Sequence, residues 1–358
     1  MYNNFWKNKK VLITGHTGFK GSWLALILQY LGAEVIGFAL PPPTKINLFE
    51  LANVSKNMIS LQGDIRDFVH LKNIIAKHKP EVIFHLAAQP IVLRSHQDPV
   101  ETFSTNVLGV VNLLEAIRQT PFTTSVVNVT SDKCYENQNW VWGCRENDTL
   151  GGVDPYSSSK ACSELISHSY RSSFFANKNN TKQKVRLATV RAGNVIGGGD
   201  WSEYRIVPDC VQAWMHGDIL KIRSPNAVRP WQHVLEPLCG YLKLAQALYE
   251  QKIGFEEAWN FGPSNNDVYS VQDIIKIMAE LWGELAKWEL DYDINTEEAY
   301  YLKLDVSKAN SKLGWSTILD IETTLKYTVD WYKYYQNNPE KIGDETFKQI
   351  DGYISKIT

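Results

Sequence analysis

The chain contains no long hydrophobic run. The best candidate, residues 23–28, is six residues long, whereas a helix that spans a bilayer needs about 20 apolar residues. The first ten residues, MYNNFWKNKK, also lack the apolar stretch of a signal peptide. We therefore expect no membrane anchor and no membrane partner.

Cysteine is scarce, and no two cysteines have the spacing of a metal site or stand close together in the sequence. Such spacings are what a disulfide framework or a zinc site requires. We therefore expect no disulfide, no metal and a reducing, cytoplasmic environment. The five cysteines are Cys134, Cys144, Cys162, Cys210 and Cys239.

An excess of charge of either sign is also missing. Lys and Arg total 37 and Asp and Glu total 39, for a net charge of −2. A near-neutral chain has no overall electrostatic attraction for nucleic acid, so we expect no nucleic-acid partner. With 358 residues, of which 44% are hydrophobic and 21% charged, the chain is globular and long enough for about two domains.

The hydrophobic pattern alternates short apolar runs with helical periods. Parallel strands joined by helices produce this alternation, which predicts an α/β fold with a doubly wound, mostly parallel Rossmann sheet. The expected strands are residues 11–14, 34–40, 58–62, 82–86, 125–129 and 185–190. One expected helix ends at residue 31, and three others cover residues 67–78, 100–118 and 156–175.

The pattern changes after about residue 192, where short strands and helices mix in a smaller α+β C-terminal domain. We place a dinucleotide-binding domain at residues 1–192 and a substrate domain at residues 193–358. The apolar segment within residues 228–262 is expected to return to the first domain.

A glycine turn follows the first expected strand. Gly15, Gly18 and Gly21 have the spacing GxxGxxG between a strand and a helix. Glycine lets the backbone approach a pyrophosphate, and the N-terminus of the helix attracts its negative charge. The turn predicts an NAD-type dinucleotide cofactor; the alternative is a tight turn without a ligand.

The next strand ends support parts of this cofactor site. The second strand ends without the acid that binds the adenosine ribose in many NAD sites, which leaves NAD and NADP both open. Asp64 and Ile65 end the third strand and could contact adenine, although an Asp there could equally cap the following helix. Leu86, Ala87 and Ala88 end the fourth strand, where small residues let a cofactor lie close.

Tyr156 and Lys160 are four residues apart at the start of an expected helix, so their side chains share a face. An ammonium beside a phenol favours the phenolate, and we expect a lowered pKa for Tyr156. Tyr156 could then remove a proton from a sugar hydroxyl during hydride transfer. Ser131, at the end of the fifth strand, could hydrogen-bond the same oxygen.

Asp132 and Lys133 follow Ser131 directly. An acid that protonates a leaving hydroxyl, beside a base that takes a carbon-bound proton, permits elimination of water. A surface ion pair between the two side chains is the alternative.

These residues stand in motifs that resemble the extended short-chain dehydrogenases/reductases, and within them the nucleotide-sugar 4,6-dehydratases. The resemblance extends over nearly the whole chain. Its motifs are TGHTGFKGSW from Thr14, HLAAQP from His85, TNVLGVVNLLEA from Thr105, TSDKCY from Thr130, PYSSSKACSE from Pro155, RAGNVIGGGDW from Arg191, RPWQHV from Arg229 and LDVSKANSKLGW from Leu304.

The resemblance implies a role for each matching residue. Tyr156, Lys160 and Ser131 match the dehydrogenase residues, and Asp132 matches the acid at the C6 oxygen. Most relatives carry Glu as the C5 base where this chain has Lys133, which leaves the identity of that base open. The resemblance also places Thr17, Phe19 and Asn106 at the cofactor, and Asn194, Arg205 and Arg229 at the nucleotide diphosphate in a nucleotide-sugar-binding domain.

The implied reaction starts with oxidation at C4 by bound NAD. Water then leaves across C5 and C6, and reduction at C6 regenerates the cofactor. The resemblance favours CDP-glucose as substrate, with a product that feeds deoxysugars of bacterial surface polysaccharide. A dehydratase of another nucleotide sugar, a sugar 4-epimerase and a non-catalytic NAD-binding regulator are the alternatives. Relatives imply a homodimer or larger homo-oligomer built on the helices after Pro99 and Tyr156.

Overall fold

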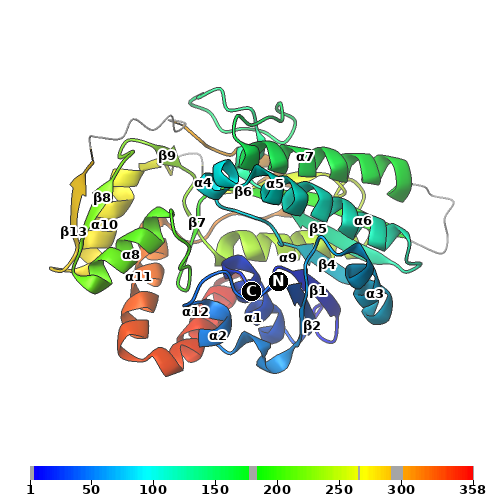
Figure 1. Cartoon of the computed structure of the whole chain (residues 1–358), viewed down its shortest axis with the longest axis horizontal. Coiled ribbons are helices and arrows are strands. Elements are labelled where there is room, and N and C mark those ends of the chain that lie inside the picture. Colours follow the sequence, from blue (N-terminus) through cyan, green and yellow to red (C-terminus); the bar gives the residue numbers. More distant parts are fainter. Residues whose placement is uncertain (1–3, 177–183, 265–266, 292–300, 358) are drawn as a thin grey trace.

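A seven-stranded parallel sheet forms the centre of the molecule. The computed structural model describes residues 4–176, 184–264, 267–291 and 301–357. The strand order is β11-β6-β5-β4-β1-β2-β3, and every pairing in the sheet is parallel (Figure 1). The strands are β1 (Lys10–Thr14), β2 (Glu34–Ala39), β3 (Ile59–Gln62), β4 (Val82–His85), β5 (Thr124–Val129), β6 (Val185–Ala192) and β11 (Ala258–Phe261).

The strand order reverses between β1 and β4. The chain winds outward from β1 through β2 to β3, and then crosses back to β4 on the other side of β1. Ligands of open α/β sheets bind at the carboxyl ends of strands beside such a reversal. The doubly wound fold predicted from the sequence is confirmed, and its topology points to the turns after β1 and β4.

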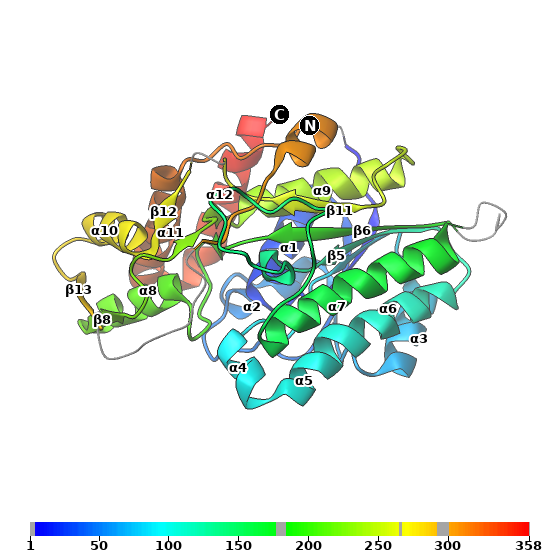
Figure 2. The same ribbon diagram turned by 90° about the horizontal axis from the view of Figure 1, so that it is seen from above.

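Helices cover both faces of the sheet, as Figures 1 and 2 show together. The central strands are therefore buried on both sides, and every residue of β4 and β5 is buried. One face carries α3 (Phe68–His78), α5 (Pro99–Phe103), α6 (Gly109–Arg118) and α7 (Pro155–Tyr170), and the other carries α1 (Phe19–Tyr30), α9 (Leu235–Tyr249) and α12 (Ile342–Ile357).

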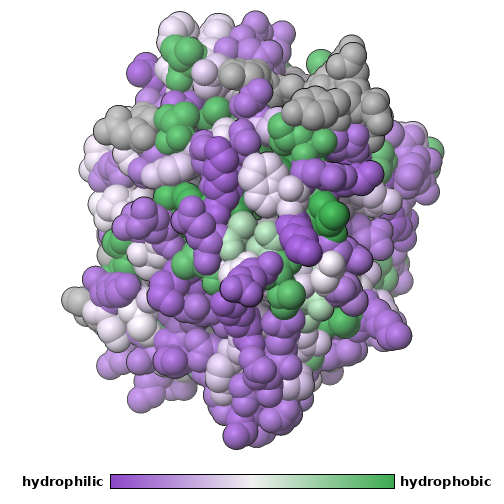
Figure 3. Space-filling model, turned by 90° about the vertical axis from the view of Figure 1, so that its left-hand side faces the viewer, coloured by the Kyte–Doolittle hydropathy of each residue, from purple (hydrophilic) through white to green (hydrophobic). Residues whose placement is uncertain are grey.

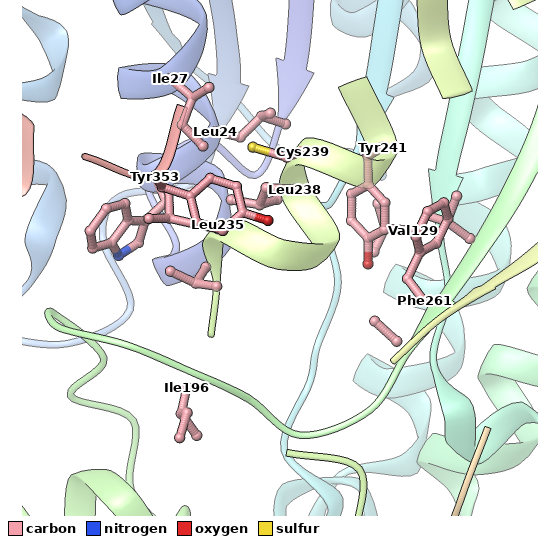
Figure 4. Close-up of a cluster of buried hydrophobic side chains, with 14 of the residues drawn as sticks. Leu24, Ile27, Val129, Ile196, Leu235, Leu238, Cys239, Tyr241, Phe261 and Tyr353 are labelled. Atoms are coloured by element: carbon pink, nitrogen blue, oxygen red, sulfur yellow. The ribbon is translucent and has the colours of Figure 1, made fainter. Parts of the chain in front are cut away.

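The core under α1 joins distant parts of the sequence. Leu24 and Ile27 of α1 lie beside Leu238 of α9 and Tyr353 of α12 (Figure 4). The Oη of Tyr353 also donates a hydrogen bond of 2.5 Å to Oε2 of Glu236 in α9. The last helix, α12, therefore packs on α1 and supports the glycine turn that precedes α1.

The helix expected over residues 100–118 is interrupted. The structure has α5, then a π-helical turn at Ser104–Leu108, then α6. Single π turns are often found at functional sites. Here the extra residue turns the amide of Asn106 inward, to Gln89 and Ser159. The apolar pattern continues through the turn, so the π turn could not be predicted from the sequence.

Most of the chain after β6 forms a smaller assembly at one end of the sheet (Figure 1). It contains α8 (Ile206–His216), β8 (Ile219–Ile222), α10 (Val271–Trp282), β13 (Lys287–Leu290) and α11 (Ile321–Asn337). Figure 3 shows this end of the molecule, where hydrophilic side chains predominate and hydrophobic ones are scattered. None of the helices in the described residues is long and apolar enough to cross a membrane.

The remaining elements are short. They are α2 (Leu48–Leu51), α4 (Val92–Gln97), β7 (Val195–Ile196), β9 (Val228–Arg229), β10 (Gln232–His233) and β12 (Tyr269–Ser270), with one-turn helices at Val54–Asn57, Asp132–Cys134, Arg171–Phe175, Ala309–Leu313 and Pro339–Lys341. The chain also returns to the sheet, because α9 packs on β5 and β6 and β11 pairs with β6.

The segment after β7 is held from two sides. The indole N–H of Trp23 in α1 donates to the carbonyl of Gly198 (2.9 Å), and Oη of Tyr332 in α11 donates to the carbonyl of Asp200 (2.6 Å). A Cβ on Gly198 would lie 2.0 Å from the Trp331 ring. Glycine is therefore required there, and the contacts fix the segment that carries Asp200 and Arg205.

Candidate active site

The turns after β1 and β4 are in direct contact. Gly15 has a φ of +79°, and a Cβ on it would lie 2.7 Å from the amide N of Ala87. The amide of Ala87 donates to Oγ1 of Thr14 (3.3 Å), which is also 2.7 Å from Nδ1 of His85. Gly15 and the small residues after β4 are thus required by the packing of the protein itself.

Gly18 and Gly21 differ in what surrounds them. A Cβ on Gly21 would lie 2.1 Å from the carbonyl O of Gly15, so Gly21 is required by the turn. Gly18 has an ordinary φ of −79°, and the nearest atom to its Cβ would be 3.5 Å away. Nothing in the described protein demands glycine there, which fits the close approach of a ligand.

Helix α1 begins directly after Gly18. Its N-cap, Gly18, provides no side-chain hydrogen bond, and the first turn contains no acidic residue. The free backbone N–H groups and the helix dipole therefore favour an anion such as a pyrophosphate. Thr17 and Phe19 line a small cavity beside the turn, and Oγ1 of Thr17 donates to the carbonyl of Leu40 (2.9 Å) at the end of β2. These features fit a dinucleotide.

Asp64 does not cap the next helix. The N-cap of α3 is Asp67, which accepts from the amide of His70. Asp64 instead forms an ion pair of 2.6 Å with Arg66, whose hydrogen bonds lower the pKa of the carboxyl. Ile65 is buried against Gly109. The capping alternative for Asp64 is therefore wrong, and its contact with adenine stays a prediction.

Asn106 holds the loop after β4 against α7. Its Oδ1 accepts from the amide of Gln89 (2.8 Å), and its Nδ2 donates to the carbonyl of Gln89 (3.0 Å) and to Oγ of Ser159 (2.9 Å). The side chain is buried and fully engaged. Any effect of Asn106 on a cofactor therefore acts through the loop that contains Leu86, Ala87 and Ala88.

Tyr156 and Lys160 lie in the first turns of α7, whose N-cap is Asp154. Burial raises the pKa of Tyr156 to about 12, although a hydrogen bond with Ser131 acts in the opposite direction. Burial also lowers the pKa of Lys160 to about 8, and its ammonium donates to the carbonyl of Val129 (3.2 Å). The expected lowering of the Tyr156 pKa by Lys160 is wrong for the protein alone, because desolvation of the phenolate dominates.

Asp132 is a buried acid with one unbonded oxygen. Oδ1 accepts from Oγ of Ser131 (3.1 Å), whereas Oδ2 has no partner among the described residues. Burial raises the pKa of Asp132 against the attraction of Lys133, Arg229 and Lys20. Asp132 and Lys133 form no ion pair in the described part of the chain, so the surface-pair alternative is wrong. Burial thus favours the protonated form of this carboxyl, the form that can donate a proton.

Gly193 closes one side of this carboxyl. A Cβ there would lie 2.1 Å from the ring of Pro230 and 2.9 Å from Oδ2 of Asp132. From the sequence alone Gly193 has no assigned role, because a single glycine after a strand has several explanations. In the fold it lets β6 end directly against the carboxyl of Asp132.

A buried ion pair fixes α7 to the strands. Glu164 lies two turns beyond Tyr156, and its carboxylate accepts from Nε (2.8 Å) and Nη2 (3.0 Å) of Arg191 in β6. Thr130 and Thr189 also donate to it, at 2.5 and 2.6 Å. The two charged side chains are only 3% and 2% exposed. Although burial alone would raise the pKa of Glu164, these bonds hold it below its ordinary value.

Two of the three expected substrate residues lie near Tyr156 or Asp132. The charge of Arg205 acts on Tyr156, and the charge of Arg229 acts on Asp132. Arg205 donates to Oδ2 of Asp200 (2.8 Å), and Arg229 is buried in β9. Asn194 lies between β6 and β7, and its backbone carbonyl accepts a hydrogen bond from the amide of Gln232 (3.1 Å).

Lys20 is a further charged residue of this site. It is the second residue of α1, and the charges of Arg205, Asp132, Lys160 and Asp200 all act on it. The sequence analysis treated it only as part of the glycine motif. Its proximity to Asp132 became visible once α1 and β5 were placed in the fold.

The contrast between Gly18 and Gly21 predicts two different substitution effects. Gly18→Ala should change the free energy of unfolding by no more than about 1 kcal/mol, because the added Cβ meets no protein atom closely. It should weaken NAD binding at least about tenfold, because the Cβ would occupy the space assigned to the ligand. Gly21→Ala should cost about 3 kcal/mol through overlap with Gly15. Urea unfolding and calorimetric titration measure the two effects. Unchanged NAD affinity in a folded Gly18→Ala protein would contradict the ligand assignment.

The buried ion pair predicts a large loss of stability for one substitution. Glu164→Gln leaves the Arg191 charge buried without its counter-ion, which should cost about 3–5 kcal/mol. The matched control is Asp330→Asn, which breaks the exposed Lys326–Asp330 pair and should cost less than about 1 kcal/mol. Urea unfolding gives both values. Equal losses in the two variants would show that the buried pair stabilises the fold no more than the exposed pair does.

Comparisons with known proteins agree with this geometry. The sequence profile described as GDP-mannose 4,6 dehydratase matches residues 12–328. The CDP-glucose 4,6-dehydratase of Salmonella typhimurium is 50% identical over 355 residues, which cover 99% of each chain. The dTDP-glucose 4,6-dehydratase of Xanthomonas campestris is 24% identical and covers 94% of this chain and 97% of its own.

Solved structures share the fold. The UDP-glucose 4-epimerase of Thermotoga maritima superimposes with a TM-score of 0.77 at 23% identity, over 91% of this chain and 99% of its own. The dTDP-glucose 4,6-dehydratase of Bacillus anthracis, in complex with NAD, has a TM-score of 0.75 at 23% identity, over 92% and 98%. With the profile match over most of its length, the chain belongs to the GDP-mannose 4,6 dehydratase family.

Proposed function

We propose that this protein is a CDP-glucose 4,6-dehydratase, a lyase that converts CDP-glucose to CDP-4-keto-6-deoxyglucose and water. The relative from Salmonella typhimurium supports this substrate. The observation that supports dehydration is the state of Asp132. Its carboxyl is buried and has a raised pKa, it accepts a hydrogen bond from Ser131, and its charge acts on Tyr156. A simple dehydrogenase or epimerase has no use for such an acid.

The cofactor in this proposal is NAD. NAD, when bound, accepts a hydride from C4 of the sugar and later returns it to C6. The glycine turn would hold its pyrophosphate on the N-terminus of α1, where Gly18 leaves room. NAD is favoured over NADP because residues 35–40 at the end of β2 contain no cation for a 2′-phosphate.

Tyr156 carries the first proton transfer. Its buried phenol is protonated in the protein alone, so it becomes a base only when positive charge gathers around it. Lys160, one helical turn away, provides part of that charge, and Ser131 holds the sugar oxygen in line. Burial of all three residues keeps water away from the reacting atoms.

Asp132 and Lys133 carry the dehydration. Once C4 is a ketone, the C5 proton is acidic, and a base can remove it. Lys133 takes this proton in the proposal, while Asp132 donates a proton to the C6 oxygen as the C6–O bond breaks and water leaves. The field of Lys133 reaches Asp132, so the acid and the base lie near the same pair of carbons. Because Asp132 acts in its protonated form, dehydration should slow as the pH rises through its pKa.

The C-terminal part of the chain binds the nucleotide in this proposal. Residues 193–358 contain Arg205, Arg229 and Asn194, and guanidinium groups suit diphosphate oxygens. The charge of Arg229 acts on Asp132, and that of Arg205 acts on Tyr156. Binding of the diphosphate by this part would therefore place the glucose over Tyr156 and Asp132.

Proton NMR of the reaction in heavy water tests the proposal. With NAD and CDP-glucose we expect a new C6 methyl signal and deuterium at C5, whereas UDP-, dTDP- and GDP-glucose turn over poorly. Tyr156→Phe should abolish turnover. Asp132→Asn should permit oxidation at C4 but slow water loss by about 10²- to 10⁴-fold.

The controls are Tyr30→Phe and Asp330→Asn, which alter exposed side chains of the same types and should keep normal rates. Retention of the CH₂OH signal with inversion at C4 would instead identify a sugar 4-epimerase. Normal dehydration by Asp132→Asn would remove Asp132 from its role.

The proposed assembly is a homodimer through the α5–α7 face. Val100 of α5, Leu108 of the π turn and Leu165 of α7 are 76%, 56% and 58% exposed, and their helices lie side by side (Figure 2). Large apolar side chains gathered on one face favour association.

Sedimentation velocity should therefore give twice the chain mass, and Leu108→Glu with Leu165→Glu should give monomers. The control, Ile253→Glu, alters an equally apolar but isolated exposed residue and should leave the dimer intact. A monomeric native protein would contradict this assembly.

A further inference from the structure

The proposed acid and base of the dehydration stand on one short turn. Asp132 and Lys133 lie in the one-turn helix at Asp132–Cys134, which Ser131 caps. The bond that closes this turn, from the amide of Cys134 to the carbonyl of Ser131, is longer than usual at 3.3 Å. Oδ1 of Asp132 accepts from Ser131, and Oδ2 has no partner in the described part of the chain. The direction of the carboxyl therefore depends on how the backbone is held on both sides of the turn.

Thr130 holds the N-terminal side of the turn. Its amide donates to the carbonyl of Val190 in β6 (2.9 Å), and its hydroxyl donates to Oε1 of Glu164 in α7 (2.5 Å). The residue before Ser131 is thus fixed both to the sheet and to the helix that carries Tyr156.

Tyr135 holds the C-terminal side of the turn. Its backbone forms an antiparallel bridge with Leu150, and the amide of Gly151 donates to the carbonyl of Cys134 (2.9 Å). Residues 149–151 belong to the irregular segment before α7. These backbone bonds therefore join one loop to another, and a further contact has to connect the two loops to the sheet.

The side chain of Tyr135 makes that connection. Its Oη accepts from Nη1 of Arg191 in β6 (2.7 Å) and donates to Oδ1 of Asn260 in β11 (2.7 Å). The guanidinium of Arg191 also lies over the buried phenol ring, 4.7 Å from its centroid. A phenylalanine ring would fill the same space. The hydroxyl, with its charge-assisted hydrogen bond, is therefore the part of the side chain that fixes its position.

The two sides of the turn meet at one buried ion pair. Thr130 is bonded to Glu164, Tyr135 is bonded to Arg191, and these two charged side chains are bonded to each other at 2.8 Å. We propose that Tyr135 is a positioning residue, whose hydroxyl holds the turn so that the Asp132 carboxyl points at the leaving oxygen of the sugar. This inference rests on the proposed function and adds to it a residue that acts through Asp132.

The inference separates two steps of the reaction. Oxidation at C4 uses Tyr156, which stands on α7, and Ser131, which directly follows the residue bonded to α7. Loss of water uses Asp132, which lies on the side of the turn that Tyr135 holds. Removal of the Tyr135 hydroxyl should therefore slow the loss of water and leave the oxidation nearly unchanged, whereas a general loss of structure would slow both steps.

Single-turnover kinetics of the full chain with NAD and CDP-glucose measure both steps. The absorbance of NADH rises as C4 is oxidised and falls when the dehydrated sugar is reduced at C6. In Tyr135→Phe the rate constant of the rise should stay within about twofold and that of the fall should decrease about tenfold or more, because a small misplacement of a reacting group can cost about 10²-fold. A smaller folded fraction would change the amplitudes and not these rate constants.

The matched control is Tyr249→Phe. Oη of Tyr249 in α9 also bridges a charged pair, since it accepts from Nζ of Lys9 (2.9 Å) and donates to Oε1 of Glu81 (2.9 Å). The ammonium of Lys9 also lies over its ring. This pair is at the amino ends of β1 and β4, at the opposite edge of the sheet from Asp132. Tyr249→Phe should therefore show native rate constants in both phases.

A second variant tests the same hydroxyl from its other side. Asn260→Ala removes the acceptor of the Tyr135 Oη and should also slow the fall of NADH more than the rise. Equal slowing of both phases in Tyr135→Phe, or native rate constants in both, would overturn the inference while the proposed function stands. Absence of both the NADH signal and the C6 methyl product in the native protein would overturn the proposed function as well.

Discussion

The ion pair between Arg191 and Glu164 is the constraint on which the site depends. It joins β6 to α7 in the interior, and the same carboxylate accepts from Thr130, one residue before Ser131 and two before Asp132. Nη1 of Arg191 also donates to Oη of Tyr135 (2.7 Å), just beyond residues 131–133. Because buried charges tolerate little displacement, the pair fixes the register of the helix that carries Tyr156 and Lys160 against the loop that carries Asp132.

Desolvation sets the protonation of that site. The same burial raises the pKa of Asp132 and of Tyr156 and lowers the pKa of Lys160. Each direction follows from the cost of an isolated charge away from water. Burial therefore favours the protonated forms of both Asp132 and Tyr156 in the protein alone.

The sequence was informative where a local pattern carries the physical cause. The glycine turn, the apolar strands and the spacing of Tyr156 and Lys160 predicted the doubly wound sheet and the arrangement around α7. Features that depend on contacts between distant segments could not be predicted from the sequence. The pKa of Tyr156 depends on burial, the π turn at Asn106 on contacts with Gln89 and Ser159, and the roles of Gly193 and Lys20 on segments that only the fold brings together.

The return of the chain to β6 has a consequence for biosynthesis. Until α9 and β11 have been made, β6 is an open edge of the sheet and one face of β5 and β6 lacks its cover. Unpaired edges and uncovered apolar faces are where nascent chains aggregate. A growing polypeptide that has left the ribosome only as far as Ala192 therefore contains Ser131, Asp132 and Tyr156 but still exposes this edge and this face.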